Sequence, residues 1–183
     1  MTQHANNLFI VTGAPGAGKT TLLDLAGKSG FGIGKEAARA VIQSQAAIDG
    51  PAVQWRNPSM FAELMLDRDI QSWQSLRGNA GPVLCDRGIP DLVAFGRMLK
   101  LPDHGHFHRA AMLYRYNSLV FFAPPWPEIF VTDAERTEDL QHAQRIYEPM
   151  RDVYEELGYH VVELPKAPVA ARLAFVRDAI AHA

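Results

Sequence analysis

Residues 8–28 read LFIVTGAPGAGKTTLLDLAGK and contain a complete match to the pattern G-x-x-x-x-G-K-[S/T]. The apolar run at 8–11 has the composition of a buried strand, and apolar residues recur at helical spacing over 20–28. A strand, a glycine-rich turn and a helix in this order form the context in which this pattern binds phosphate. The sequence therefore predicts a phosphate-binding loop made of Gly13, Ala14, Pro15, Gly16, Ala17, Gly18, Lys19, Thr20 and Thr21.

The residue types in this loop suit a nucleoside triphosphate with magnesium. Glycines let successive backbone N–H groups turn inward around phosphate oxygens, in conformations that a Cβ would obstruct. The helix that begins near Lys19 directs the positive end of its dipole at the same anion. We predict that Lys19 reaches the β- and γ-phosphates and that the Thr20 hydroxyl is a ligand of Mg²⁺.

The rest of the chain alternates apolar runs with helical patterns. Helices are indicated over 20–28, over 35–47, from Ser59 as N-cap onward, over much of 128–157, and from Pro168 onward. Further strands are indicated by the apolar runs at 31–33, 82–85, 119–122 and 159–164. This alternation predicts one α/β domain over residues 1–183, with a three-layer, doubly wound parallel sheet. Ligands of such sheets gather at the carboxyl ends of the strands.

Composition narrows the functional classes. The 183 residues are 48% hydrophobic and 21% charged, which is ordinary for one folded globular domain. The formal charge of −2 gives no general attraction to nucleic acid or to anionic membranes, so we expect neither as a partner. The one cysteine, Cys85, and the absence of a signal-like N-terminal segment lead us to expect a cytoplasmic protein. Whether it is a monomer or a homodimer stays open.

A second motif, Asp86-Arg87-Gly88, follows the apolar run at 82–85. An acidic residue at the end of a second buried strand is where a phosphate-loop protein places its other magnesium-ordering carboxylate, so we assign Asp86 to Mg²⁺. The alternative is an aspartate that caps the next turn. Remodelling ATPases usually place a glutamate after this aspartate, whereas Arg87 stands here. A cation beside the phosphate path favours phosphoryl transfer over hydrolysis.

Asp86-Arg87-Gly88 resembles the Asp-Arg-x motif of thymidylate-kinase-like and deoxynucleoside-kinase-like enzymes. The wider pattern resembles a family of small AAA-labelled P-loop ATPases and kinases related to the ribosylnicotinamide kinase domains of NAD-biosynthesis proteins. The resemblance implies a P-loop fold of the nucleotide-kinase type, phosphoryl transfer as the reaction class, and ATP over GTP. The segments that carry it are residues 11–22, 36–39, 86–91, 124–126, 132–136, 158–159 and 164–166.

Within this family frame, Glu36 and Arg39 become candidate site residues. Related kinases place an acidic residue after the second strand to activate the substrate hydroxyl, and the two side chains share one helix face. Glu36 could accept the proton of the acceptor while Arg39 steadies a phosphate or the base. The alternative is an ordinary surface ion pair. Asp86 is the rival base, and the sequence does not separate the two.

The polar helical segment after the fourth strand corresponds to the lid of P-loop kinases, here about residues 128–151. Lid arginines swing over the phosphates and shield the reaction from water. Arg136 and Arg145 are the candidates, and the family-like segment around Arg136 favours it. The alternative is a solvated charged helix face. Trp126, between prolines beside the expected lid, is the aromatic residue most expected to have a functional role. Lys166 lies in the loop after the last strand, where the resemblance to similar folds implies a place near the adenine.

Together these features predict a small-molecule kinase that transfers the γ-phosphoryl group of Mg-ATP to a nucleoside-like or other small acceptor. The predicted catalytic set is Lys19, Glu36, Arg39, Asp86, Arg87 and Arg136. Two alternatives remain. One is a nucleotide-dependent binding switch, and the other is a slow ATPase.

Overall fold

The computed structural model describes residues 2–130 and 140–183. At its centre lies a five-stranded sheet in the order β3-β4-β2-β6-β7, in which every neighbouring pair is parallel. This arrangement confirms the predicted doubly wound α/β architecture. The strands are β2 (Leu8–Gly13), β3 (Gly32–Gly34), β4 (Val83–Asp86), β6 (Leu119–Ala123) and β7 (His160–Glu163).

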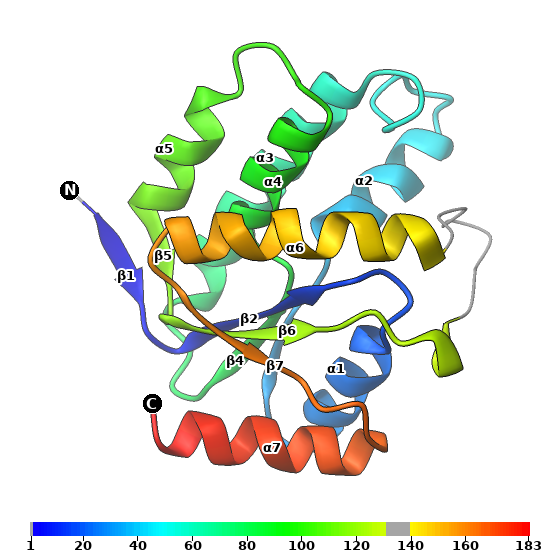
Figure 1. Ribbon diagram of the computed structural model, residues 1–183. Coiled ribbons are helices and arrows are strands. Elements are labelled where there is room, and N and C mark those ends of the chain that lie inside the picture. The colour runs from blue at the N-terminus through cyan, green and yellow to red at the C-terminus, as the bar shows by residue number, and fades with distance from the viewer. Residues whose placement is uncertain (1, 131–139) are drawn as a thin grey trace.

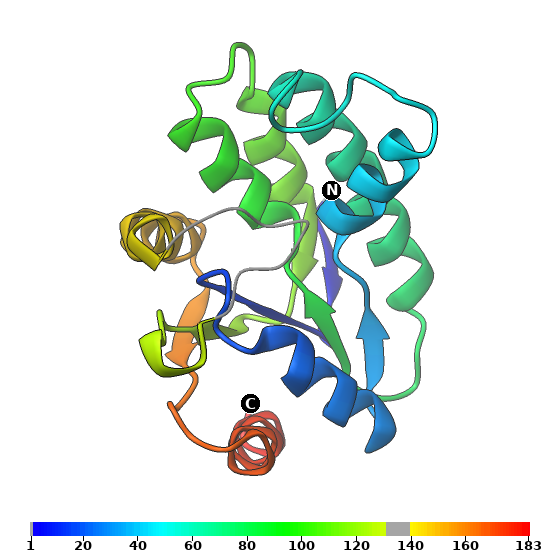
Figure 2. The ribbon, with the colours of Figure 1, turned by 90° about the vertical axis from the view of Figure 1, so that its right-hand side faces the viewer.

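Helices cover both faces of the sheet, which gives three layers (Figures 1 and 2). On one face α1 (Lys19–Lys28) packs against α7 (Val169–Ala181). Within the described ranges, none of the helices is both long and apolar enough to cross a bilayer. The other face carries α2 (Ala37–Ala46), α3 (Pro58–Leu76), α4 (Ile89–Met98), α5 (Gly105–Leu113) and α6 (Leu140–Glu156).

The two central strands are continuous apolar runs because both of their faces are covered. Every residue of β2 and of β6 is buried. Val11 of β2 is in register with Asp86 of β4, and Gly13 is in register with Ala123 of β6. Since parallel strands place their carboxyl ends at one edge, the segments that follow β2, β4 and β6 meet there.

The sequence missed three kinds of element. Helix α4, which is buried at most of its positions, was not indicated by the sequence, and α5 follows it through a short loop. A small parallel pair, β1 (Gln3–Ala5) and β5 (Tyr114–Tyr116), lies apart from the main sheet. A 3₁₀ turn spans Pro127–Ile129.

The N-cap predicted for α3 is wrong by two residues. The helix begins at Pro58, and the side chain of Asn57 accepts a hydrogen bond of 3.0 Å from the backbone N–H of Met60. Proline at the first helical position loses no hydrogen bond, because that N–H has no partner within the helix. Ser59 therefore lies inside the first turn.

The later part of the segment assigned to the lid is helical. Residues 140–151 belong to α6, which packs on α4, β2 and β7. Its buried side includes Ala143, Tyr147, Met150 and Tyr154, so this part of the chain is a layer of the domain. Among the residues expected in a lid, 131–139 lie outside the described residues, and Arg136 is one of them.

Candidate active site

The phosphate loop leaves β2 and enters α1 with glycines where the backbone requires them. Gly13 has φ of 109°, and a Cβ there would lie 2.4 Å from the carbonyl oxygen of Ala123. Gly18 caps α1 in the left-handed conformation, with φ of 72°. Other residues would be strained at both positions. The loop therefore presents a backbone cradle at the N-terminus of α1, which suits an anion.

Lys19 lies over this cradle. The residue is only 4% exposed, and its Nζ donates to the carbonyl oxygen of Ala14 at 2.6 Å and to that of Gly13 at 3.4 Å. Thr20 and Thr21, in contrast, are exposed. The ammonium group is thus held on the loop itself, while the threonine hydroxyls face outward beside it.

A cavity of about 430 Å³ adjoins the loop, and we call it the phosphate-loop cavity. Trp126 and Arg172 contribute to its wall, with the Arg172 guanidinium 5.8 Å from the centre of the Trp126 ring. Ala167, the neighbour of Lys166, also lines it, so the loop after β7 does reach this region. The loop residues in its wall are Gly16, Ala17, Gly18, Lys19, Thr20 and Thr21.

Sequence reasoning missed Arg172. It is 3% exposed and donates to the carbonyl oxygen of Ala17 at 3.0 Å, so it ties α7 to the phosphate loop. Burial lowers the pKa of Arg172 below its ordinary value. An arginine in the C-terminal helix gave no signal of this contact, because the contact depends on how α7 packs against α1.

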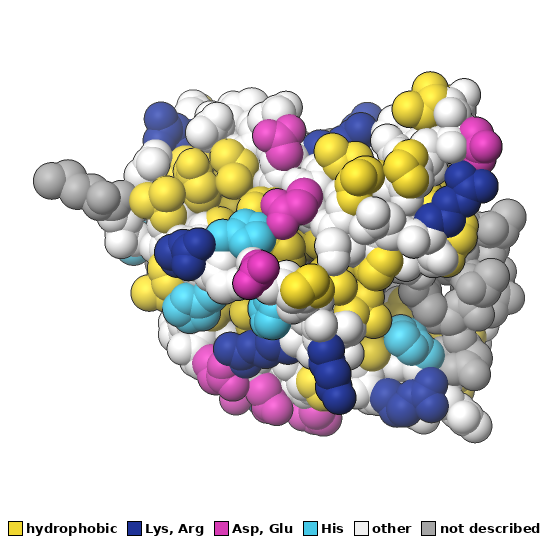
Figure 3. Space-filling model, turned by 90° about the horizontal axis from the view of Figure 1, so that it is seen from above, with side chains coloured by type: hydrophobic (Ala, Val, Ile, Leu, Met, Phe, Trp, Pro, Cys, Tyr) yellow, Lys and Arg dark blue, Asp and Glu magenta, His cyan; other side chains and the backbone are white. Residues whose placement is uncertain are grey.

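A second cavity, of about 410 Å³, lies among the helices of the other face, and we call it the inter-helix cavity. Hydrophobic side chains on this face are partly exposed (Figure 3), and among them Trp55 and Leu99 line the cavity. Phe61, Met65, Leu92, Phe95, Met98 and Met150 form much of its apolar wall. Its charged or titratable wall residues are Glu36, Arg39, Asp69, Arg87, Asp91 and His142.

The two cavities adjoin. Arg39 of α2 lines both, and Pro15 of the phosphate loop lines the inter-helix cavity. A ligand in one cavity would therefore lie near a ligand in the other, and Arg39 belongs to the wall of both.

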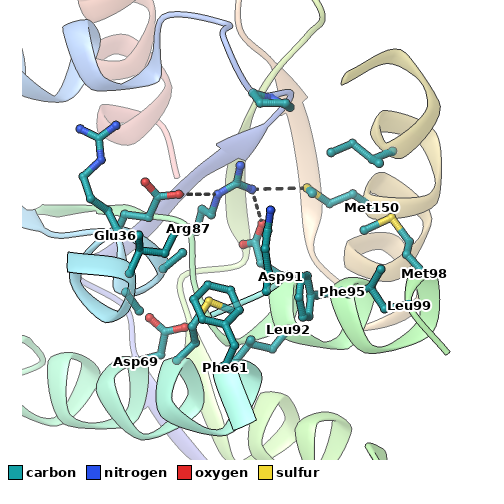
Figure 4. A pocket seen from close by; sticks show the side chains of 18 of the residues that line it. Glu36, Phe61, Asp69, Arg87, Asp91, Leu92, Phe95, Met98, Leu99 and Met150 are labelled. Atoms are coloured by element: carbon teal, nitrogen blue, oxygen red, sulfur yellow. Dashed lines mark hydrogen bonds and ion pairs between the residues drawn. The ribbon is translucent and has the colours of Figure 1, made fainter. Parts of the chain in front are cut away.

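Arg87 forms the polar centre of the inter-helix cavity (Figure 4). Its Nε lies 3.1 Å from Glu36 Oε1, and one of its terminal nitrogens lies 2.9 Å from Asp91 Oδ1. Its backbone φ is 67°, an uncommon value for a residue other than glycine. Burial lowers the pKa of Arg87, but the carboxylates of Asp91, Glu36 and Asp86 outweigh it and hold that pKa above the ordinary value. Arg87 therefore stays cationic.

Asp91 fixes Arg87 in place. Besides the arginine, its carboxylate accepts hydrogen bonds from Thr12 Oγ1 at 2.6 Å, from the Gly88 backbone N–H at 3.0 Å and from the Tyr154 hydroxyl. It thus ties β2, α4 and α6 together at the carboxyl edge of the sheet. The sequence offered one signal of this role, an acid three residues after Gly88 at the start of a helix.

The predicted site residues are only partly brought together. Glu36, Arg39 and Arg87 share the inter-helix cavity, and Lys19 and Thr20 share the phosphate-loop cavity.

Other predicted residues lie apart from these walls. Asp86, at the end of β4, lines neither cavity. Arg145 of α6 is exposed and also lines neither, whereas His142, Ile146 and Met150 of that helix reach the inter-helix cavity.

The parallel sheet with this loop at its edge has the P-loop fold. The model of an AAA domain family matches residues 8–172, and the chain belongs to that family. Thymidylate kinase from Ehrlichia chaffeensis has a similar structure, with a TM-score of 0.62 over 95% of this chain and 98% of that chain. At 13% sequence identity this likeness shows the fold alone. No curated protein matches the chain in sequence. The relation to ribosylnicotinamide kinase domains stays a prediction.

Proposed function

We propose that this protein is a kinase that transfers the γ-phosphoryl group of Mg-ATP to a small acceptor held in the inter-helix cavity. The observation that carries the proposal is the adjoining pair of cavities. One surrounds the phosphate loop, the other is an apolar chamber with a carboxylate and a guanidinium, and Arg39 lines both. A hydrolase or a binding switch needs no second chamber of this kind. Both cavities fall within the range of about 300–1,000 Å³ typical of small-molecule sites.

In the phosphate-loop cavity the chain's own residues suit a triphosphate. The glycine cradle leaves space that a Cβ would fill, and Lys19 can exchange its bond to the Ala14 carbonyl for bonds to phosphate oxygens. Thr20, in the first turn of α1, and Asp86, at the end of β4, are the oxygen donors assigned to magnesium. When bound, the metal neutralises charge that develops on the transferred group. Trp126 offers a face for the nucleotide base.

Glu36 is the best candidate for the general base. Its side chain is 10% exposed, lies in the inter-helix cavity and contacts Arg87. Asp91 also lines that cavity, but its oxygens already accept four hydrogen bonds. Asp86 lines neither cavity. Glu36 is therefore placed to accept the proton of an acceptor hydroxyl, and Arg39 to steady the phosphate that passes between the cavities.

The shape and chemistry of the inter-helix cavity favour a flat, partly apolar acceptor, of which a nucleoside is the first example. Phe61 and Phe95 are packed edge to face, 6.1 Å apart, and both line the cavity. Phe95 is the more accessible of the two, because Phe61 is only 1% exposed, and the Phe95 ring offers apolar surface to a ring-shaped ligand. A cytoplasmic location, where ATP is available, forms part of the same proposal.

The test is phosphate transfer from γ-labelled ATP with magnesium to a panel of nucleosides, nucleotides and other small hydroxylated metabolites. Label on one acceptor, lost in Lys19→Ala, is the expected result. Free phosphate is measured in parallel. Phosphate release without labelled acceptor would identify a slow ATPase, and tight nucleotide binding with neither product would identify a switch; either result would overturn the proposal.

A further inference from the structure

Asp69 on α3 is a carboxylate in the wall of the inter-helix cavity that neither the sequence motifs nor the proposed chemistry uses. It follows Phe61 and Met65 at intervals of four residues, and all three line the cavity, as side chains on one face of a helix do. Figure 4 shows Asp69 and Phe61 on the same side of the cavity, with Arg87 and Asp91 across from them. Asp69 is thus a charged group set in an otherwise apolar helix face.

No hydrogen bond or ion pair to the Asp69 side chain occurs within residues 2–130 and 140–183. Arg87, the cation whose charge acts on Asp69, is bonded to Glu36 and to Asp91 instead. Burial, and then the charges of Asp91 and Glu36, raise the pKa of Asp69 well above its ordinary value, and Arg87 lowers it only in part. A carboxyl group kept in this position has acceptor oxygens that the protein itself leaves unused.

The charge balance at this wall shows which ligand group would use those oxygens. Glu36, Asp69 and Asp91 surround the one guanidinium of Arg87, so acidic groups are in excess. Arg39 and His142 also line the cavity and complete its set of charged or titratable groups. An amino group that enters here would bond to Asp69 and also gain from the charges of Glu36 and Asp91. A carbonyl group gains from neither the Glu36 nor the Asp91 charge, because it carries no positive charge. It would bond only to protonated Asp69, the form that the raised pKa favours in the empty cavity, whereas a bound ammonium group lowers that pKa again.

We propose that Asp69 is a specificity-determining residue, and that the acceptor has an apolar or aromatic body bearing an amino group that binds to Asp69. In this arrangement Phe61 and Met65 contact the body of the ligand, and Glu36 faces its hydroxyl. The inference rests on the proposed function only in that it calls the bound ligand an acceptor. The preference of the cavity for amines is a binding property and can be measured without turnover.

The binding test uses three probes that share a phenyl ring and differ in the polar group: 2-phenylethylamine, 2-phenylethanol and 3-phenylpropanoate. Each is titrated into the nucleotide-free protein and followed by NMR. We expect the amine to bind about tenfold or more tightly than the alcohol, because the bond it gains is charge-assisted, and the carboxylate to bind least. In Asp69→Asn, which keeps the size of the side chain, the preference for the amine should disappear.

Asp67→Asn is the matched control. Asp67 lies on the same helix two residues earlier, is exposed, and bonds to Gln71 at 2.7 Å on the outer surface. This variant makes the same chemical change outside the cavity and should bind the probes as the parent protein does. Equal binding of amine and alcohol by the parent protein, or an amine preference that survives Asp69→Asn, would overturn the inference.

A second arm separates this inference from the proposed kinase. Two nucleoside pairs, cytidine with uridine and adenosine with inosine, each exchange a ring amino group for a carbonyl group, and all four are offered with Mg-ATP. Phosphorylation that favours the amino member in the parent protein and loses that preference in Asp69→Asn supports both. Phosphorylation with no preference, unchanged by Asp69→Asn, refutes the role of Asp69 and leaves the kinase in place. Amine-selective probe binding with no phosphorylation of any acceptor supports Asp69 and refutes the kinase.

Discussion

The phosphate-loop cavity and the inter-helix cavity are built from the chain in different ways. The first takes six consecutive residues, Gly16 to Thr21, and adds a few from the segment after β6 and from α7. The second draws most of its wall from α2, α3, α4 and α6, and its lining residues run from Pro15 to Met150. The loop is therefore readable as a motif, whereas the second cavity exists only after four helices have packed. The difference separates what is common to P-loop proteins from what is particular to this one.

The largest expected effect lies on the phosphate-loop side. Lys19→Ala removes the ammonium group now bonded to the loop carbonyls, and phosphoryl transfer should fall by about 10²-fold or more because transition-state charge loses a fixed cation. Steady-state kinetics with γ-labelled ATP measures it. Lys28→Ala, at the exposed end of α1, is the control and should keep its rate. Equal rates in the two variants would remove Lys19 from the chemistry.

On the inter-helix side the largest effect should be on stability. Asp91→Ala leaves the buried Arg87 without one of its carboxylates and leaves Thr12 and Tyr154 without their acceptor. Removing one partner of a buried ion pair costs about 3–5 kcal/mol, so urea denaturation should show a loss near the lower end of that range. Asp178→Ala, an exposed aspartate on α7, should change the free energy of unfolding little. A loss as small as in that control would mean that Asp91 does not hold the edge of the sheet together.

Substitutions of the two candidate bases, Glu36 and Asp86, should have smaller effects that differ in kind. Glu36→Gln keeps the shape of the side chain and its place in the inter-helix cavity but removes the base, so transfer should fall by about 10²-fold with ATP binding unchanged. Asp86→Asn should instead raise the magnesium concentration needed for half-maximal rate, because Asp86 is assigned to the metal, and excess magnesium should restore the rate. Single-turnover rates across a magnesium titration separate the two. A loss of rate in Asp86→Asn that magnesium does not relieve, with Glu36→Gln active, would exchange the roles.

The features that the sequence predicted are those set by local patterns, and the features that it missed depend on the packing of distant segments. The positions of the sheet strands along the chain and their parallel arrangement could be predicted, because strands such as Leu8–Gly13 and Leu119–Ala123 are continuous apolar runs. Helix α4 was missed because its ten residues include Pro90 and Gly96, the two residue types that favour a helix least.

In the site, the loop and the presence of Arg87 were predicted, but the partners of Arg87 were not. The ion pair with Glu36 joins residues 51 positions apart, and no local pattern records it. Asp69 was missed for the same reason. A lone acid on a helix has the same local pattern whether it faces water or a cavity.

The smallest effect tests the sequence against the structure at one helix end. Sequence reasoning made Ser59 the N-cap of α3, whereas the structure gives that bond to Asn57. Asn57→Ala should therefore lower the free energy of unfolding by about 1 kcal/mol, and Ser59→Ala by well under that, because only the first removes an acceptor from the Met60 N–H. Urea titrations of the two variants in parallel measure this difference in the free energy of unfolding. A larger loss for Ser59→Ala than for Asn57→Ala would mean that α3 begins at the later residue. The side chains of α3 that face the inter-helix cavity would then have to be reassigned.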